Sequence, residues 1–139
     1  MDRWFENKRF GFIKVYRSIL HDGWFKNHKL LIFWLYCLIK ASHSKHAILI
    51  NSQRVVLEPG QFIFGRKKAS IETGLSQRTV RTCLHNLFRM GNLTIKPTSQ
   101  YSLVTVVNWE LYQTKEVEPT SKPTNDRPAT DQPPTTYNY

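Results

Sequence analysis

Apolar side chains recur at the spacing of an α-helix in four segments of the chain, and most of these segments have a recognisable start or end. In the first segment, Ile13, Tyr16 and Ile19 would share one face. In the second, Asn27 precedes a run that is apolar nearly all round, which is typical of a helix buried at the centre of a domain. The predicted helices are Phe10–Leu20, Lys29–Ala41, Arg66–Thr73 and Gln77–Met90.

Short apolar runs between turn residues predict the strands. Ala47–Ile50 and Arg54–Leu57 are separated by Asn51-Ser52-Gln53, which predicts a hairpin with a three-residue loop. Glu58-Pro59-Gly60 is expected to be a turn. The other predicted strands are Gln61–Phe64, Leu93–Lys96 and Ser102–Val107, and Pro97–Tyr101 is expected to be the turn between the last two.

The order of these elements predicts the fold class. A helix, a short strand, two helices joined by a Gly-Leu-Ser turn and a final hairpin follow one another as in a winged helix. Gly74 allows the positive φ that reverses the chain between two helices, and Ser76 is a good N-cap for the second of them. We therefore expect an α+β, mainly helical domain: a winged helix-turn-helix with a small antiparallel β-sheet, whose last hairpin is the wing.

The helix after the Gly-Leu-Ser turn, near Ser76–Met90, carries the strongest functional signal. Its outward side chains include no carboxylate, whereas a helix face that serves solubility alone normally mixes charges of both signs. An α-helix fits the major groove of DNA, where Arg, Gln, Thr and His bind base edges or phosphates. The inward face is Val80, Cys83, Leu84 and Leu87, and the outward face is Arg78, Thr82, His85 and Arg89, with Arg81 on the flank and Gln77 at the start.

Charge supports a polyanionic partner. The 139-residue chain has a formal net charge of +10, and the excess lies in its first part. Met1–Lys115 contains 18 Lys and Arg against 6 Asp and Glu, whereas Glu116–Tyr139 contains 2 against 4. The second part is rich in Pro and Thr and is almost without aliphatic residues. We therefore expect a DNA-binding domain over residues 1–115 and a disordered tail or linker over residues 116–139.

Two further segments are candidate contacts with DNA. Arg66-Lys67-Lys68 begins the helix that crosses the phosphate backbone in helix-turn-helix docking, although cations are slightly unfavourable at a helix N-terminus. The wing would offer Lys96, Thr98, Ser99 and Gln100 to a phosphate or to the minor groove. The complete set of candidate DNA-binding residues is Arg66, Lys67, Lys68, Ser76, Gln77, Arg78, Thr79, Arg81, Thr82, His85, Arg89, Lys96, Thr98, Ser99 and Gln100.

Other classes of function find less support. Cys37 and Cys83 have no CxxC spacing and are expected to be buried free thiols in a reducing cytoplasm. His43 and His46 have no acidic residue nearby in the sequence, and the carboxylates form no cluster typical of a nuclease. The longest apolar run, Leu30–Ile39, is about half of a membrane span. We therefore expect neither an enzyme nor a membrane protein, and no cofactor, metal site or catalytic residue.

From about Gly11 to Tyr112 the chain resembles the N-terminal domain of phage and prophage replication initiators, the replisome-organiser or DnaD-like group. The resemblance is carried by GFIKVYRSILHDGWFKN, LLIFWLYCLIKA, LEPGQFIFGRKKAS, TGLSQRTVRTCLHNLFRMGNLTI and YSLVTVVNWELYQ. It implies binding to an origin in phage-type DNA replication. It also implies that the linker of such proteins leads to a C-terminal part that engages a helicase or helicase loader. On this reading the chain is either a fragment of such a protein or a stand-alone DNA-binding protein.

Two alternatives stay open at this point. A transcriptional regulator of a phage or mobile element would use the same domain, because winged helices serve both roles. A protein-interaction module would instead use the apolar run Leu31–Ile39 or Trp4-Phe5 as an oligomer interface. The second alternative is compatible with DNA binding, since such domains often bind as homodimers or higher oligomers.

Overall fold

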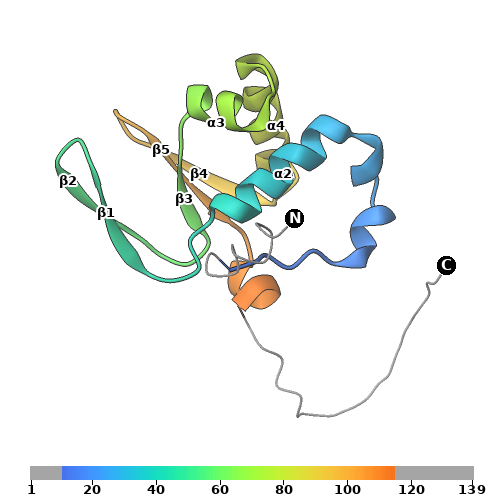
Figure 1. Cartoon of the computed structure of the whole chain (residues 1–139), viewed down its shortest axis with the longest axis horizontal. Coiled ribbons are helices and arrows are strands. Elements are labelled where there is room, and N and C mark those ends of the chain that lie inside the picture. Colours follow the sequence, from blue (N-terminus) through green and yellow to red (C-terminus); the bar gives the residue numbers. More distant parts are fainter. Residues whose placement is uncertain (1–10, 115–139) are drawn as a thin grey trace, which may run out of the picture.

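The computed structural model describes residues 11–114. The predicted tail at 116–139 lies outside these residues, and so does Trp4-Phe5. The described part of the chain forms an α+β domain in which three α-helices and several shorter helical turns accompany two small antiparallel sheets (Figure 1).

The three α-helices lie together on one side of a three-stranded sheet. The helix α4 packs against both α2 and α3, and Figure 1 shows α3 and α4 at the top of the molecule. The bounds of these helices are His28–Lys40 for α2, Arg66–Thr73 for α3 and Gln77–Arg89 for α4. The shorter turns are η2 (Arg17–Leu20), η3 (Trp24–Lys26) and η4 (Glu110–Thr114). All three α-helices were predicted within one residue of these bounds.

The larger sheet has the order β3-β5-β4, so its central strand is the last in the chain. Its strands are β3 (Gln61–Phe64), β4 (Leu93–Pro97) and β5 (Ser102–Val106). Phe62 is paired with Val104, which in turn is paired with Ile95 on the other side. Because side chains alternate across a strand, this register directs Phe62 and Val104 to the same face, where both are buried against the helices.

The core lies between this sheet and the helices. Phe33 and Cys37 of α2 are completely buried, and so are Val80 and Leu87 of α4. The predicted inward face of α4 is confirmed, because all four of its residues are buried. The helix α2 contributes Leu30, Phe33, Cys37 and Leu38 to the core, but it is not buried all round as its apolar pattern predicted, because Ile32 and Ile39 are 44% and 64% exposed. The cap is also confirmed, since Asn27 Oδ1 accepts the backbone N–H of Leu30 at 3.2 Å.

The predicted helix over Phe10–Leu20 is wrong. The chain is without helix from Gly11 to Tyr16, and only η2 forms in this segment. The physical reason is a contact 99 residues away in the sequence: Gln113 Oε1 accepts the N–H of Lys14 at 2.8 Å, and Gln113 Nε2 donates to the carbonyl of Lys14 at 2.8 Å. The buried amide of Gln113 thus satisfies both backbone groups of Lys14, which a helix would have paired within the segment.

The smaller sheet is the predicted hairpin, with one correction. Its strands are β1 (His46–Ile50) and β2 (Gln53–Leu57), so its loop has two residues rather than three. Asn51 and Ser52 both have positive φ, 51° and 68°, which is the geometry of the tight turn that matches the twist of two paired strands. Gln53 is therefore paired with Ile50 and belongs to the strand.

Candidate nucleic-acid interface

The helix α3 begins with three exposed basic residues. Arg66, Lys67 and Lys68 occupy its first turn, where no acidic residue accompanies them. The preceding Gly65 provides no side-chain cap. Cations at this position lie next to the positive end of the helix dipole, which is electrostatically unfavourable. The clustering of three such residues therefore needs a reason other than the stability of the helix.

At its opposite end, α3 is fixed to α2 through Glu72. The carboxylate of Glu72 accepts the hydroxyl of Tyr36 at 2.7 Å and pairs with Lys40 Nζ at 3.5 Å. The hydrogen bond from Tyr36 is the main cause that lowers the pKa of Glu72, and the charges of Lys40 and Lys68 lower it further. Burial and the same carboxylate raise the pKa of Tyr36. The one carboxylate of α3 is thus turned toward α2.

The turn between α3 and α4 is held by hydroxyl groups. Gly74 has a φ of 79°, as its role in reversing the chain requires. Ser70 Oγ donates to the carbonyl of Leu75 at 2.6 Å, and Thr73 Oγ1 accepts the N–H of Leu75 at 3.2 Å. Ser76 caps α4, because its Oγ accepts the N–H of Thr79 at 3.1 Å. These bonds fix the angle at which α4 leaves α3.

The outer face of α4 brings the predicted residues together. One shallow, open depression of about 360 Å³ runs along it. Its lining residues are Arg78, Arg81, Thr82, His85, Asn86 and Arg89. Asn86 was not among the predicted residues; its Oδ1 accepts a hydrogen bond from Arg89 Nη2 at 3.3 Å. It lies four residues after Thr82 and three before Arg89, and this helical spacing was the signal that could have identified it.

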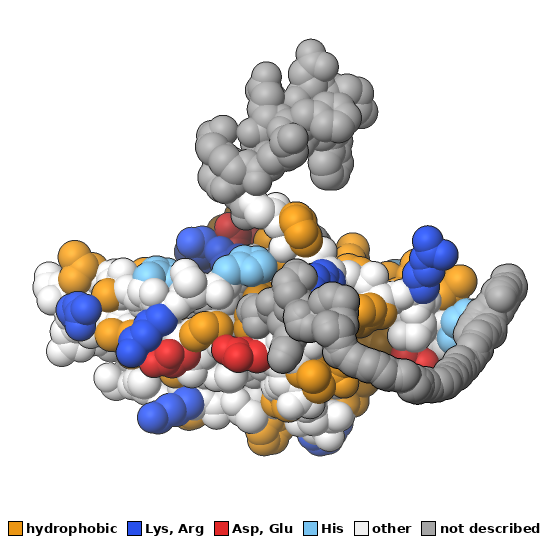
Figure 2. Space-filling model, turned by 90° about the horizontal axis from the view of Figure 1, so that it is seen from below, with side chains coloured by type: hydrophobic (Ala, Val, Ile, Leu, Met, Phe, Trp, Pro, Cys, Tyr) orange, Lys and Arg blue, Asp and Glu red, His pale blue; other side chains and the backbone are white. Residues whose placement is uncertain are grey.

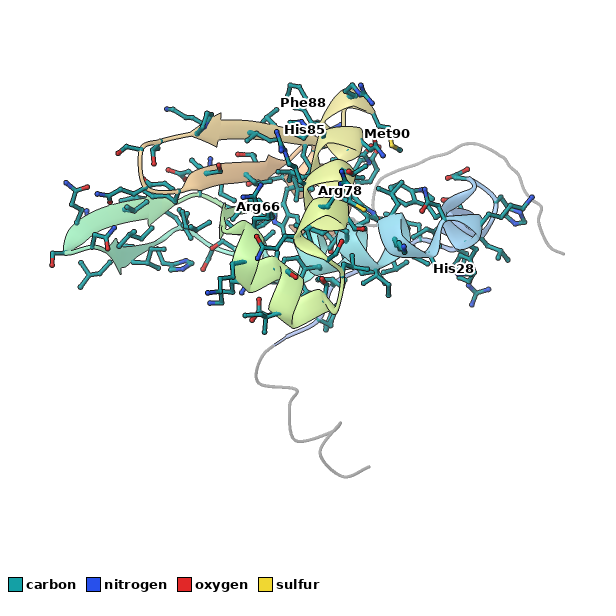
Figure 3. The ribbon with its side chains drawn as sticks, turned by 90° about the horizontal axis from the view of Figure 1, so that it is seen from above. His28, Arg66, Arg78, His85, Phe88 and Met90 are labelled. Atoms are coloured by element: carbon teal, nitrogen blue, oxygen red, sulfur yellow. The ribbon has the colours of Figure 1, made fainter. Side chains whose placement is uncertain are left out.

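Charge on α3 and α4 is of one sign apart from Glu72. In the sequence, Glu72 is the only acidic residue between Glu58 and Glu110. Among residues 11–114, the ion pairs closer than 4 Å are Lys40–Glu72 and Lys45–Glu58, so the exposed arginines of α4 have no acidic partner there. Figure 3 shows Arg66, Arg78 and His85 on the face formed by α3 and α4. The lower face of the molecule, by contrast, carries acidic and basic side chains side by side (Figure 2).

The turn between β4 and β5, the predicted wing, is held by hydrogen bonds of the Thr98 hydroxyl. Thr98 Oγ1 accepts the N–H groups of Gln100 and Tyr101 at 3.2 and 3.1 Å and donates to the carbonyl of Tyr101 at 2.9 Å. Lys96 and Ser99 are exposed. Gln100 Oε1 accepts a hydrogen bond from Asn51 Nδ2 at 2.8 Å. The side chains left to a ligand are therefore those of Lys96 and Ser99, together with the amide nitrogen of Gln100.

Two predicted contact residues have structural tasks. Ser76 and Thr79 are hydrogen-bonded to each other, because Ser76 Oγ also donates to Thr79 Oγ1 at 3.0 Å.

The other predicted residues of α4 are available at its surface. Gln77 begins α4 and is exposed, as are Thr82 and Arg89. The structure thus presents a basic start of α3, an acid-free outer face of α4 and a compact hairpin tip.

Other groups in the described residues are occupied in packing. Cys37 and Cys83 are free and buried, and burial raises the pKa of both thiols. His43 has its ring against Trp109 at 5.5 Å between centroids, and His46 Nδ1 lies 3.0 Å from Ser42 Oγ. Within residues 11–114 no three His, Cys, Asp or Glu side chains are grouped as metal ligands. No helix in the same range is long and apolar enough to cross a membrane.

Comparison with known proteins finds no matching family model, no matching curated protein and no matching solved structure. The resemblance to replication initiators consequently stays a prediction from the sequence.

Proposed function

We propose that the protein binds double-stranded DNA as a winged helix, with α4 in the major groove. The order of α2, β3, α3, α4, β4 and β5 supports this proposal, as does the sheet order β3-β5-β4, which brings the β4–β5 hairpin next to the end of α4. On this reading α3 and α4 are the helix-turn-helix, and the β4–β5 hairpin is the wing.

One observation carries the proposal: the outer face of α4 is basic, exposed and without an acidic partner among residues 11–114. Arg78, Arg81 and Arg89 line the same depression as Thr82, His85 and Asn86. Arginine binds guanine edges through two hydrogen bonds, and asparagine does the same with adenine. A face composed of these side chains, with no carboxylate to repel phosphate, has the chemistry that direct reading of base edges needs.

The flanking elements fit the remaining parts of a DNA interface. Arg66, Lys67 and Lys68 at the start of α3 would contact phosphates, which orients the protein without reading the sequence. The tip of the wing would add Lys96 and Ser99. Such contacts are non-specific and sensitive to salt, whereas those of α4 provide the specificity.

The biological role that we propose is origin binding in phage-type DNA replication. This role is supported by the sequence resemblance alone, and a regulator of a phage or mobile element would use the same surface. Selection of bound duplexes from a random pool gives the recognised sequence, and the genomic positions at which that sequence occurs separate the two roles. Repeated sites that recur within an origin would support replication, whereas a single site beside the protein's own gene would support regulation.

The molecular proposal is tested by charge removal on α4. On the selected duplex, we expect Arg78→Ala or Arg81→Ala to weaken binding by about 1–3 kcal/mol, because each removes a group able to bind a base edge at two points. Fluorescence anisotropy titrations at fixed salt measure the loss. The matched control is Arg17→Ala, which removes the same charge from the exposed helical turn η2. An equal loss in the control, or no binding of the wild-type protein to any duplex, would contradict the proposal.

A further inference from the structure

The β1–β2 hairpin lies beside the predicted wing and reaches as far as it does. Each hairpin has two five-residue strands, and their turns are joined by the hydrogen bond of 2.8 Å between Asn51 Nδ2 and Gln100 Oε1. Figures 1 and 3 both show the two tips next to each other at one end of the molecule. A strand of five residues spans about 17 Å, and in β1 and β2 only Leu57 is buried, so this hairpin projects from the core.

The β1–β2 hairpin offers a phosphate one exposed cation, Arg54, which lies beside the exposed apolar side chain of Leu49. No acidic residue occurs between His46 and Leu57, and Arg54 is exposed with no ion pair in the described residues. Glu58, the first acidic residue after the hairpin in the sequence, pairs with Lys45 at 3.8 Å, at the base of the hairpin. The tip adds the hydroxyl of Ser52, a hydrogen-bond donor of the kind that often contacts DNA phosphates.

The turn of the hairpin keeps a side chain where glycine would fit better. A two-residue turn with two positive φ values strongly prefers Asn-Gly, but this chain has Asn51-Ser52, and Ser52 has a φ of 68°. A serine in this conformation is less favourable than glycine, so the turn gives up some stability to place a hydroxyl at the tip. The hairpin also buries little of its outer face, since Leu49, paired with Arg54, is 75% exposed.

We propose that the β1–β2 hairpin is a second arm that contacts the phosphate backbone of DNA beside the β4–β5 wing. This inference rests on the proposed DNA binding and adds a contact site to it. Arg54 and Ser52 are the contacting residues, and the Asn51–Gln100 bond holds the two tips at a fixed spacing. The bound duplex is therefore longer than α4 and one wing alone would cover.

The test compares arm variants with an α4 variant on one selected duplex. Arg54→Ala should lower the steepness of the salt dependence by about one unit and remove backbone protection at one edge of a hydroxyl-radical footprint, while central protection stays. Ser52→Gly should raise stability toward urea and still weaken the same edge. A rise in stability together with a loss of protection distinguishes a lost DNA contact from a damaged fold. Arg17→Ala, outside both hairpins, should leave footprint and slope unchanged.

The outcomes separate this inference from the proposed function. If Arg78→Ala loses affinity while both arm variants keep the wild-type footprint and slope, the arm does not bind DNA and the proposed function stands. If sedimentation shows that the arm variants change the oligomeric state while the footprint of each protomer is unchanged, the hairpin is a protein contact and the inference fails. If the wild-type protein protects no duplex, the proposed function fails and the inference with it.

Discussion

Individual hydroxyl and amide groups hold two connections of the domain in place: the turn before α4 and the contact between the first and last described segments. Ser70, Thr73 and Ser76 close the turn before α4, and Gln113 fixes the backbone at Lys14. The cap Ser76 is readable from the sequence, because a Gly followed by a Ser before a helical run marks a turn and a helix start, whereas the bonds of Ser70 and Thr73 were not predicted. The bonds of Gln113 are not readable either, since no local pattern links residues 99 positions apart. Local signals therefore predicted the turn, whereas no local signal indicated the contact between Gln113 and Lys14.

Removal of the cap at Ser76 should destabilise the protein in the absence of DNA. Ser76→Ala leaves the N–H of Thr79 without its partner, and the expected loss is about 1 kcal/mol in the free energy of unfolding. Urea denaturation followed by circular dichroism measures it. Ser99→Ala is the control, because that hydroxyl lies exposed in the β4–β5 turn. An equal effect of the two substitutions would mean that the cap does not stabilise α4.

Gly60 is required by both its conformation and its surroundings. Its φ is 89°, and a Cβ there would lie 2.6 Å from Cβ of the buried Trp109. Gly60→Ala should therefore cost about 2–5 kcal/mol, combining a left-handed backbone with a clash in a packed core. Gly91→Ala separates the backbone cost from the clash, because Gly91 has a similar φ of 85° and no atom of the described residues lies within 4 Å of its missing Cβ. Thermal unfolding should show a clearly larger loss for Gly60→Ala; equal losses would exclude the clash.

At the scale of elements, helices whose ends are marked by capping residues or glycine in the sequence were predicted well, whereas contacts between elements were not. The predicted α4 differs from the observed helix by one residue, because Ser76 and Gly91 mark its ends. The candidate site on α4 was predictable for the same reason: helical periodicity decides which side chains face outward. The contact between Asn51 and Gln100 joins two turns that are distant in sequence, and only the folded chain brings them together.

The joint between α2 and α3 should make stability depend on pH. The pKa of Glu72 is lowered in the folded protein, mainly by the hydroxyl of Tyr36 and then by the charge of Lys40. A lowered pKa contributes stability that is present above the ordinary value of about 4.5 and is lost as the pH falls through the lower, folded value. Glu72→Gln should therefore be less stable than wild type at pH 7, and this difference should shrink below about pH 4.5.

Urea denaturation midpoints from pH 3 to pH 7 measure this difference. Tyr36→Phe tests the assigned cause, because it removes the hydrogen bond at 2.7 Å and leaves Lys40 in place. A constant difference between Glu72→Gln and wild type over the whole range would show that the ionisation of Glu72 contributes nothing to stability.

At the scale of the whole molecule, the arrangement of charge matters more than its total. Among residues 11–114, α3 and α4 contain one carboxylate, that of Glu72, which is turned toward α2, while the lower face mixes signs (Figure 2). A duplex would therefore approach from the side of α3 and α4. Composition predicted a polyanionic partner, but the separation of charge between two faces could be seen only after folding.

Affinity for DNA should fall steeply with salt. If about five to eight phosphates are contacted, a log–log plot of the binding constant against salt concentration should have a slope of roughly −4 to −7. Titrations at several potassium chloride concentrations give this slope. A slope close to zero would contradict the electrostatic basis of the proposed function.

The bond between Gln113 and Lys14 has a practical consequence for attachment. It holds the first and last described segments side by side, and Figure 1 shows them at the bottom of the molecule, away from α3 and α4. A dye or surface anchor attached to an exposed neighbour of this contact, such as Val15 or Leu111, would thus lie on the side of the molecule away from α3 and α4. Single-molecule experiments can tether the protein there and leave α4 open to solution.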